Sequence, residues 1–176
     1  MSQSKVFVVC FLLFSSWCYG QNNFKSAKII LHNGDTLIGS INYRNWNRNP
    51  SQIQFRKTND VKVNTYSPLD INVFEVEGDK YYGAIVEKEV SPIKSFKLHY
   101  DGILNIKKDT VFLQSLIEGE KSFLKFKDFN NKDHFYIKEN KNYILLRYKK
   151  FYKNDNHGTQ HIVEKKTICN AAKILL

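Results

Sequence analysis

The chain has 176 residues, enough for one domain of ordinary size or two small ones. Hydrophobic residues make up 42% of it and aromatic residues 14%, a composition that supports a packed core and excludes disorder by composition. Lysine and arginine number 27 against 17 acids, so the net charge is +10. The mean hydropathy of −0.45, with no apolar run of about 20 residues, excludes a polytopic membrane protein.

The first 20 residues have the three-part pattern of a Sec signal peptide. Lys5 supplies the positive start, and the apolar run over 6–14 is too short to cross about 30 Å of hydrocarbon. Cleavage after residue 20 would make Gln21 the new N-terminus. Acylation of Cys18 is the alternative, but Trp17 precedes it where a lipoprotein signal has a small residue. We therefore expect an exported protein, in the periplasm or associated with the outer membrane and not transmembrane after cleavage.

The predicted cleavage determines which cysteines the exported chain retains. Cys10 and Cys18 would leave with the signal peptide, and Cys169 would be the one thiol of the exported chain. A single thiol forms no internal disulfide, so we expect core burial to stabilise the domain.

Beyond the signal peptide, short runs of alternating polar and apolar residues are separated by turn residues, a pattern that predicts antiparallel β structure. The clearest example is a hairpin with strands over 28–32 and 35–43. Asn33 and Gly34 lie between them, and because both tolerate positive φ they predict a two-residue type I′ turn. A polar loop over 44–50 follows.

The rest of the chain continues this pattern. One helical turn is expected at 67–70 and an irregular stretch at 89–108. From Gln160 onward, a weak 3.6-residue period predicts a short amphipathic helix. Further strands are expected at 52–56, 61–64, 73–76, 81–87, 111–117, 123–127, 134–138 and 143–147.

These elements predict a mainly β fold: an antiparallel sandwich or an open barrel-like sheet, with a short C-terminal helix. We divide the chain into a signal peptide (1–20), an antiparallel β domain (21–150) and a basic tail with the possible short helix (151–176).

Residues 33–55, NGDTLIGSINYRNWNRNPSQIQF, resemble the uncharacterised secreted β-rich module of Bacteroidota, whose signature is GDT-x-x-G-x-I-x-Y-R-N-W-x-x-N-P-x-x-I-x-F. The resemblance extends over 24–146, with further matches at 66–68 and 116–119. In that family the module often precedes an outer-membrane β-barrel, which is absent here, so a free-standing member and a truncated gene are both open. The resemblance implies no catalytic residue.

Motifs of the common enzyme classes are missing. The chain has no G-x-S-x-G, H-E-x-x-H, C-x-x-C or phosphate-binding glycine loop, and its five histidines are scattered. His157 and His161, with Cys169 beyond, make an incomplete set of metal ligands, and Gly158 weakens any helix that would align the two rings. We therefore expect a protein that is not an enzyme and has no cofactor and no bound metal.

A run of cations and aromatics over 147–153 is the first candidate binding segment. Such a run can hold phosphates while its rings rest on lipid or stack on bases. Export makes nucleic acid an improbable partner and leaves anionic envelope surfaces. The alternatives are a strand edge with lysines turned outward and an A/T-rich coding bias. The candidate residues are Arg147, Lys149, Lys150 and Lys153.

The loop at 44–50 is the second candidate. Trp46 can stack on a sugar or anchor a partner protein, with Arg44 and Arg48 beside it. The alternative is that Trp46 folds back as a lid over the β core. Two Asp-Thr-aliphatic triplets, at Thr36 and Thr110, also resemble O-glycosylation sites of periplasmic proteins of that phylum, although the same triplet leads naturally from a turn into a strand.

Together these observations predict a non-catalytic periplasmic module that contacts the cell envelope or an envelope protein. The alternatives are a glycan-binding or glycan-processing module that uses Trp46, and a remnant of a truncated barrel protein.

Overall fold

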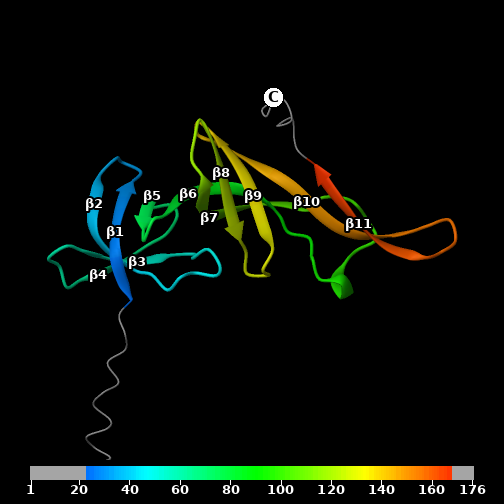
Figure 1. The fold of residues 1–176 in the computed structure, drawn as a ribbon, viewed down its shortest axis with the longest axis horizontal. Coiled ribbons are helices and arrows are strands. Elements are labelled where there is room, and N and C mark those ends of the chain that lie inside the picture. Colours follow the sequence, from blue (N-terminus) through cyan, green and yellow to red (C-terminus); the bar gives the residue numbers. More distant parts are fainter. Residues whose placement is uncertain (1–22, 168–176) are drawn as a thin grey trace, which may run out of the picture.

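The computed structural model describes residues 23–167, which form one antiparallel sheet (Figure 1). The predicted signal peptide and Cys169 lie outside the described residues. Across the sheet the strand order is β11-β10-β9-β8-β7-β6-β5-β1-β2-β3-β4. The strands are β1 (Phe24–Leu31), β2 (Thr36–Asn42), β3 (Ile53–Lys57), β4 (Val63–Tyr66), β5 (Ile71–Val76), β6 (Asp79–Glu89), β7 (Ile106–Ile117), β8 (Lys121–Lys127), β9 (Asp133–Glu139), β10 (Asn142–Asn154) and β11 (Gln160–Thr167).

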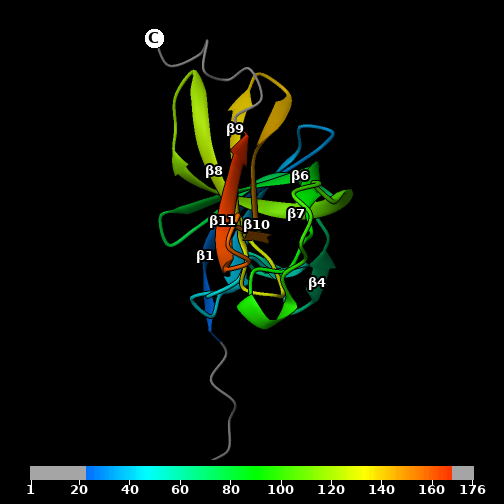
Figure 2. The same cartoon turned by 90° about the vertical axis from the view of Figure 1, so that its right-hand side faces the viewer.

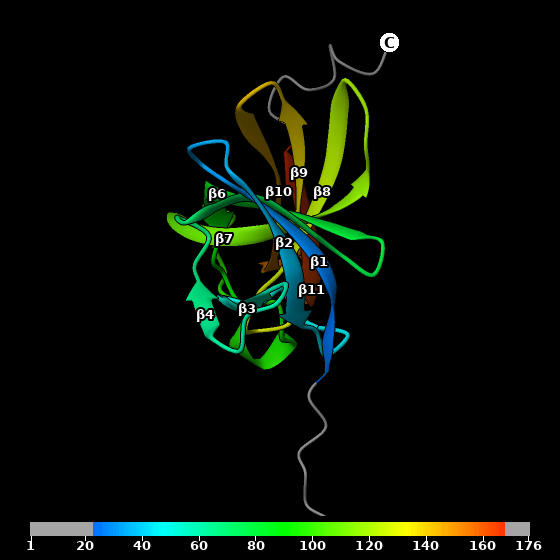
Figure 3. The same ribbon diagram turned by 90° about the vertical axis from the view of Figure 1, so that its left-hand side faces the viewer.

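The sheet is open and strongly coiled, which confirms the mainly β prediction. In Figure 1, β1–β5 lie at one end of the molecule and the β10–β11 hairpin reaches the other. Figures 2 and 3 show that β8 and β9 run across the direction of β6 and β7. This coiling follows from the right-handed twist of the strands and lets the two faces of one sheet each enclose a core.

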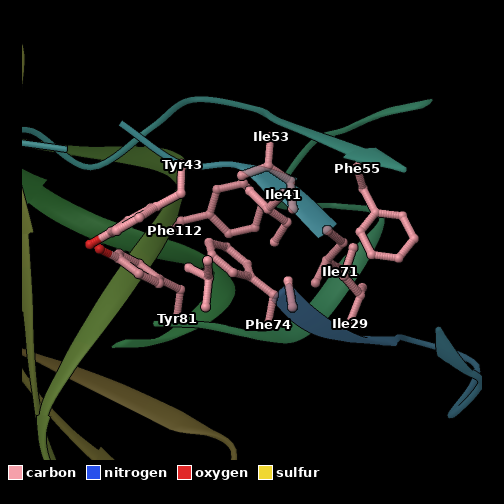
Figure 4. Close-up of a cluster of buried hydrophobic side chains, with 11 residues drawn as sticks. Ile29, Ile41, Tyr43, Ile53, Phe55, Ile71, Phe74, Tyr81 and Phe112 are labelled. Atoms are coloured by element: carbon pink, nitrogen blue, oxygen red, sulfur yellow. The ribbon is translucent and has the colours of Figure 1, made fainter. Parts of the chain in front are cut away.

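The first core lies at the end of the molecule formed by β1–β5 (Figure 4). Phe74 is fully buried at its centre, with its ring stacked on Tyr81 at 4.7 Å and edge-on to Phe112 at 5.0 Å. Ile53 and Phe55 of β3 are buried while Gln54 between them is exposed, as their alternation predicts. Aromatic packing of this kind adds about 0.5–1.5 kcal/mol per pair to the burial energy.

The second core lies between β6–β7 and β8–β10. Tyr136 is fully buried there, and its hydroxyl donates to the Glu87 carbonyl at 2.9 Å. Leu124 and Leu145 flank Tyr136 in register on the adjacent strands. Successive side chains of a strand point to opposite faces, so these strands turn every second residue away from this core.

The first hairpin forms as predicted, but the prediction of its turn is wrong. The Leu31 N–H donates to the Asp35 carbonyl at 2.9 Å and the Gly34 N–H donates to the Leu31 carbonyl at 3.0 Å, which encloses three residues. Gly34 has a positive φ of 93°, whereas Asn33 instead accepts the Asp35 N–H through its side chain at 3.0 Å. A type I turn closed by a glycine bulge also matches the strand twist. Two successive positive φ values, 51° and 85°, occur at residues 77–78 between β5 and β6.

The predicted C-terminal helix is not seen. Residues 160–167, the start of the expected helix, form β11 instead, and Ile162 pairs with Tyr152 of β10. Strand β10 continues through residue 150, so the segment expected as a tail extends the sheet. Pairing with β10 satisfies the backbone groups that a helix would have satisfied internally. The rest of the expected helix lies outside the described residues.

The connection between β6 and β7 is irregular, as predicted, and contains the 3₁₀ turn η2 (Ser95–Lys97). A buried ion pair fixes its start: Lys132 Nζ donates to Glu89 Oε2 and to the Ser91 carbonyl. Glu89 Oε1 accepts the N–H groups of Ser91 and Asn105, both at 3.1 Å. Although burial opposes ionisation, these bonds hold the pKa of Glu89 below its ordinary value. The carboxylate thus ties both ends of the connection to the β8–β9 turn.

Replacement of Lys132 by Met is expected to lower the free energy of unfolding by about 3–5 kcal/mol, because it leaves the Glu89 carboxylate buried without its cation. Urea denaturation measures this change. The matched control is Lys62→Met, at an exposed lysine, with an expected change within about 0.5 kcal/mol. A loss below about 1 kcal/mol for Lys132→Met would contradict the anchoring role of the pair.

Candidate functional site

The loop at 44–50 is held against the first core by its tryptophan. Trp46 is half-buried and its ring meets those of Tyr43, Tyr81 and Phe74 edge-on, at 4.8, 5.7 and 6.1 Å. Trp46 therefore lies over the β core as a lid, which was the alternative to its role as a surface anchor. The hydroxyl of the neighbouring Tyr43 donates to Asp79 at 2.5 Å, and burial together with this carboxylate raises the pKa of Tyr43 to about 12.

Asn49 ties the same loop to the middle of the sheet. Its side-chain amide donates to the carbonyls of Phe112 in β7 and Lys125 in β8, at 2.9 and 3.1 Å. Its side-chain oxygen accepts the Lys127 N–H at 2.9 Å. The loop is therefore fixed at two points, and Arg48 lies between them in the sequence.

Arg48 is exposed and points to the β8–β9 turn. Its Nε donates to Asn131 Oδ1 at 2.9 Å, and its guanidinium lies 5.4 Å from the centre of the Phe129 ring. The contact with Asn131 uses one of the five guanidinium N–H donors, which leaves others available to an anion.

Asp128 shapes the β8–β9 turn that carries Phe129. Its carboxylate accepts the N–H groups of Asn130 and Lys132 at 2.8 and 2.9 Å, and His134 Nε2 lies 3.1 Å away. Burial lowers the pKa of His134 below its ordinary value, so this ring is neutral near pH 7. The turn is thus a rigid support for an exposed aromatic side chain.

Between this turn, the loop at 44–50 and the β6–β7 connection lies a surface hollow of about 390 Å³. Arg48, Lys94 and Lys97 line it together with Phe129 and Ile93, and no carboxylate is among its lining residues. We call this the cationic hollow. A surface with several cations and no acid has a positive potential that attracts phosphate and carboxylate groups.

Apolar side chains are exposed around the cationic hollow. Phe129 is 85% exposed and Phe96 is 75% exposed, and Lys97 lies 5.8 Å from the Phe96 ring. Tyr100 and Ile103, farther along the same connection, are also exposed, but neither lines the hollow. Exposed aromatics next to lysine and arginine are typical of surfaces that enter a membrane interface.

The predicted basic run over 147–153 lies on β10, and most of its cations are paired within the chain. Lys149 is buried and donates to Asp101 at 2.9 Å and to the Ile103 carbonyl, so it ties β10 to the β6–β7 connection. Arg147 lies 3.4 Å from Glu87, and Lys150 lies 3.3 Å from Glu164. Lys153 is exposed near the end of the strand.

The other predicted site residues lie apart from the cationic hollow. Arg44 is exposed at the start of the loop. Thr36 is exposed in β2, and Thr110 is half-buried in β7, where its N–H donates to Asp109. His161 lies 3.1 Å from Asp155, and the described residues contain no group of three side chains suited to a metal ion.

A larger hollow of about 620 Å³ lies beside Tyr82 and Tyr143. Lys138 lies 4.9 Å and Lys80 lies 5.4 Å from the centre of the Tyr82 ring, and the hydroxyl donates to Glu118 at 2.9 Å. Stacking of a sugar on an aromatic residue needs an open ring face. Two lysines lie against the Tyr82 ring, and Trp46 is packed against three other rings. The glycan alternative therefore has weaker support than anion binding at the cationic hollow.

Sequence reasoning missed Lys94, Lys97 and Phe129. The one local signal was the cation-aromatic pattern PIKSFK over 92–97, in the stretch expected to be irregular.

No family model, curated protein or solved structure matches this chain. Within residues 23–167 the structure contains no helix that is long and apolar enough to span a membrane.

Replacement of Asn49 by Ala is expected to lower the free energy of unfolding by about 1–3 kcal/mol, because two backbone carbonyls and one N–H lose their partner. Thermal or urea unfolding measures the change. Asn47→Ala, at an exposed position of the same loop, is the control and should be nearly neutral. Equal effects of the two variants would show that Asn49 does not fix the loop.

Proposed function

We propose that this chain is a non-catalytic exported module that contacts the anionic surface of the cell envelope through the cationic hollow. The observation that carries the proposal is the convergence of Arg48, Lys94 and Lys97 on one hollow without a carboxylate. The exposed Phe96 and Phe129 rings beside these cations fit the boundary between headgroups and acyl chains.

The expected strength of this contact follows from the number of cations. Each lysine or arginine near an anionic membrane contributes about 1 kcal/mol, so the three cations of the hollow contribute about 3 kcal/mol. Partial burial of the two rings adds an apolar contribution. Binding is then reversible and weakens as salt screens the charges.

Vesicle co-sedimentation of the purified chain tests this function. We expect binding to phosphatidylcholine vesicles that contain phosphatidylglycerol and little binding to phosphatidylcholine alone. The variant Arg48→Gln/Lys94→Gln/Lys97→Gln should bind the anionic vesicles on the order of 100-fold more weakly, as about 3 kcal/mol implies.

The control for this experiment removes the same charge elsewhere. Lys28, Lys57 and Lys62 are exposed residues of β1, β3 and the β3–β4 loop, outside the hollow. Their combined replacement by Gln should leave vesicle affinity within about threefold of the starting value. Equal losses in the two triple variants would mean that net charge alone attracts the protein, and the assignment to the hollow would fail.

Export rests on the first 20 residues, which lie outside the described structure. If the predicted cleavage occurs, protein recovered from the periplasm of a Gram-negative host should begin at Gln21, as read by N-terminal sequencing and intact mass. Replacing apolar residues of the 6–14 run with Asp should retain the uncleaved chain in the cytoplasm. Cytoplasmic recovery of the unaltered chain beginning at Met1 would contradict export.

A further inference from the structure

A third hollow, of about 610 Å³, lies where two pairs of strands diverge. Strand β10 pairs with β9 as far as Leu146, opposite Phe135, and from the next residue onward it pairs with β11. The hollow occupies this fork, and we call it the fork pocket. Its volume is in the range of about 300–1,000 Å³ that is typical of small-ligand sites.

The floor of the fork pocket is apolar. Phe135, Leu146, Tyr148 and Ile93 line it. Phe135 and Leu146 are half-buried and belong to neither core, because they lie on the face of the sheet opposite the buried Tyr136.

An apolar strip continues from this floor along the same sheet face. Phe123, Ile137 and Ile144 stand side by side on β8, β9 and β10, one register step from Phe135 and Leu146. The Phe123 and Phe135 rings stack at 5.4 Å. These half-buried side chains extend the apolar surface beyond the pocket floor on the same sheet face.

The charged groups at the wall of the fork pocket, counted with their ion-pair partners, sum to one excess positive charge. Arg147 is paired with Glu87, and the other ion pairs that reach the wall join Lys132 to Glu89 and Asp133 to Lys125. Lys150 and Lys166 remain, and both contact the same carboxylate, that of Glu164, at 3.3 and 3.6 Å. Two cations beside one carboxylate leave one unit of positive charge, which one anionic group would neutralise.

We propose that the fork pocket binds one acyl chain with an anionic head group. The chain lies on Phe135 and Leu146 and extends along the apolar strip, and the head group is held by Lys150 and Lys166. The pocket adjoins the cationic hollow, since Ile93 and Asn131 line both. The two sites are nevertheless separable, because their cations are different residues.

Calorimetric titration of the purified chain with dodecanoate, below the concentration at which micelles form, tests the proposal. We expect saturable binding of one dodecanoate per chain. Dodecyltrimethylammonium and dodecyl maltoside have the same alkyl chain with a cationic or neutral head, and they should bind at least tenfold more weakly. Equal binding of the three would overturn the charge assignment, and absence of dodecanoate binding would overturn the site.

Variants at the wall and floor locate the binding. Lys150→Gln/Lys166→Gln changes two partly or fully exposed lysines and should weaken dodecanoate binding at least tenfold. Leu146→Asn, with folding checked by circular dichroism, should also weaken dodecanoate binding at least tenfold, because it places a polar group on the apolar floor. Lys28→Gln/Lys62→Gln is the matched charge control and should bind as the starting chain does. Unchanged affinity in the lysine variant would place any binding elsewhere and would contradict the proposal.

The same variants separate this inference from the proposed function. Lys150→Gln/Lys166→Gln should keep its affinity for anionic vesicles, and Arg48→Gln/Lys94→Gln/Lys97→Gln should keep its affinity for dodecanoate. Loss of vesicle binding in the chain itself, with dodecanoate binding intact, would reject the membrane contact alone. The opposite result would reject the fork pocket alone.

Discussion

The buried Glu89–Lys132 ion pair is the interaction on which the arrangement of the candidate sites depends. Glu89 ends β6, Lys132 precedes β9, and the carboxylate also holds Asn105 just before β7. A charged pair in an apolar interior is favourable only when its geometry and its additional hydrogen bonds are satisfied, which is the case here. Because the pair fixes the irregular β6–β7 connection next to the β8–β9 turn, it places Lys94 and Lys97 beside Phe129.

A second tether brings the N-terminal half of the sheet to the same place. The loop at 44–50 is anchored by Trp46 in one core and by Asn49 on the backbone of β7 and β8, and Arg48 therefore reaches the turn that Asp128 supports. Three segments far apart in the sequence meet at the cationic hollow. Each is fixed by buried or partly buried polar bonds, which limits the conformational entropy that ligand binding must overcome.

The sequence predicted the strands well because their signal is local. Alternation such as Ile53, Gln54, Phe55 has a period of two, and turn residues mark its ends. The prediction of a C-terminal helix was wrong because the spacing of apolar residues over 160–167 does not reveal that β10 is available as a pairing partner. Lys149 was expected at the surface, but its partner Asp101 lies in an irregular stretch that no pattern placed. The cationic hollow could not be predicted from the sequence for the same reason, since the Arg48–Asn131 contact joins residues 83 positions apart.

The two cores share their central strands, and this has a consequence for how the molecule unfolds. Neighbouring residues of β5, β6 and β7 point into different cores: Phe74, Tyr81 and Phe112 into the first, and Val73, Tyr82 and Leu113 into the second. Neither core can melt without exposing the apolar back of the other, so the sheet behaves as one cooperative unit. A fragment that keeps only one end of the sheet would lack the opposite covering of these strands and would be prone to self-association.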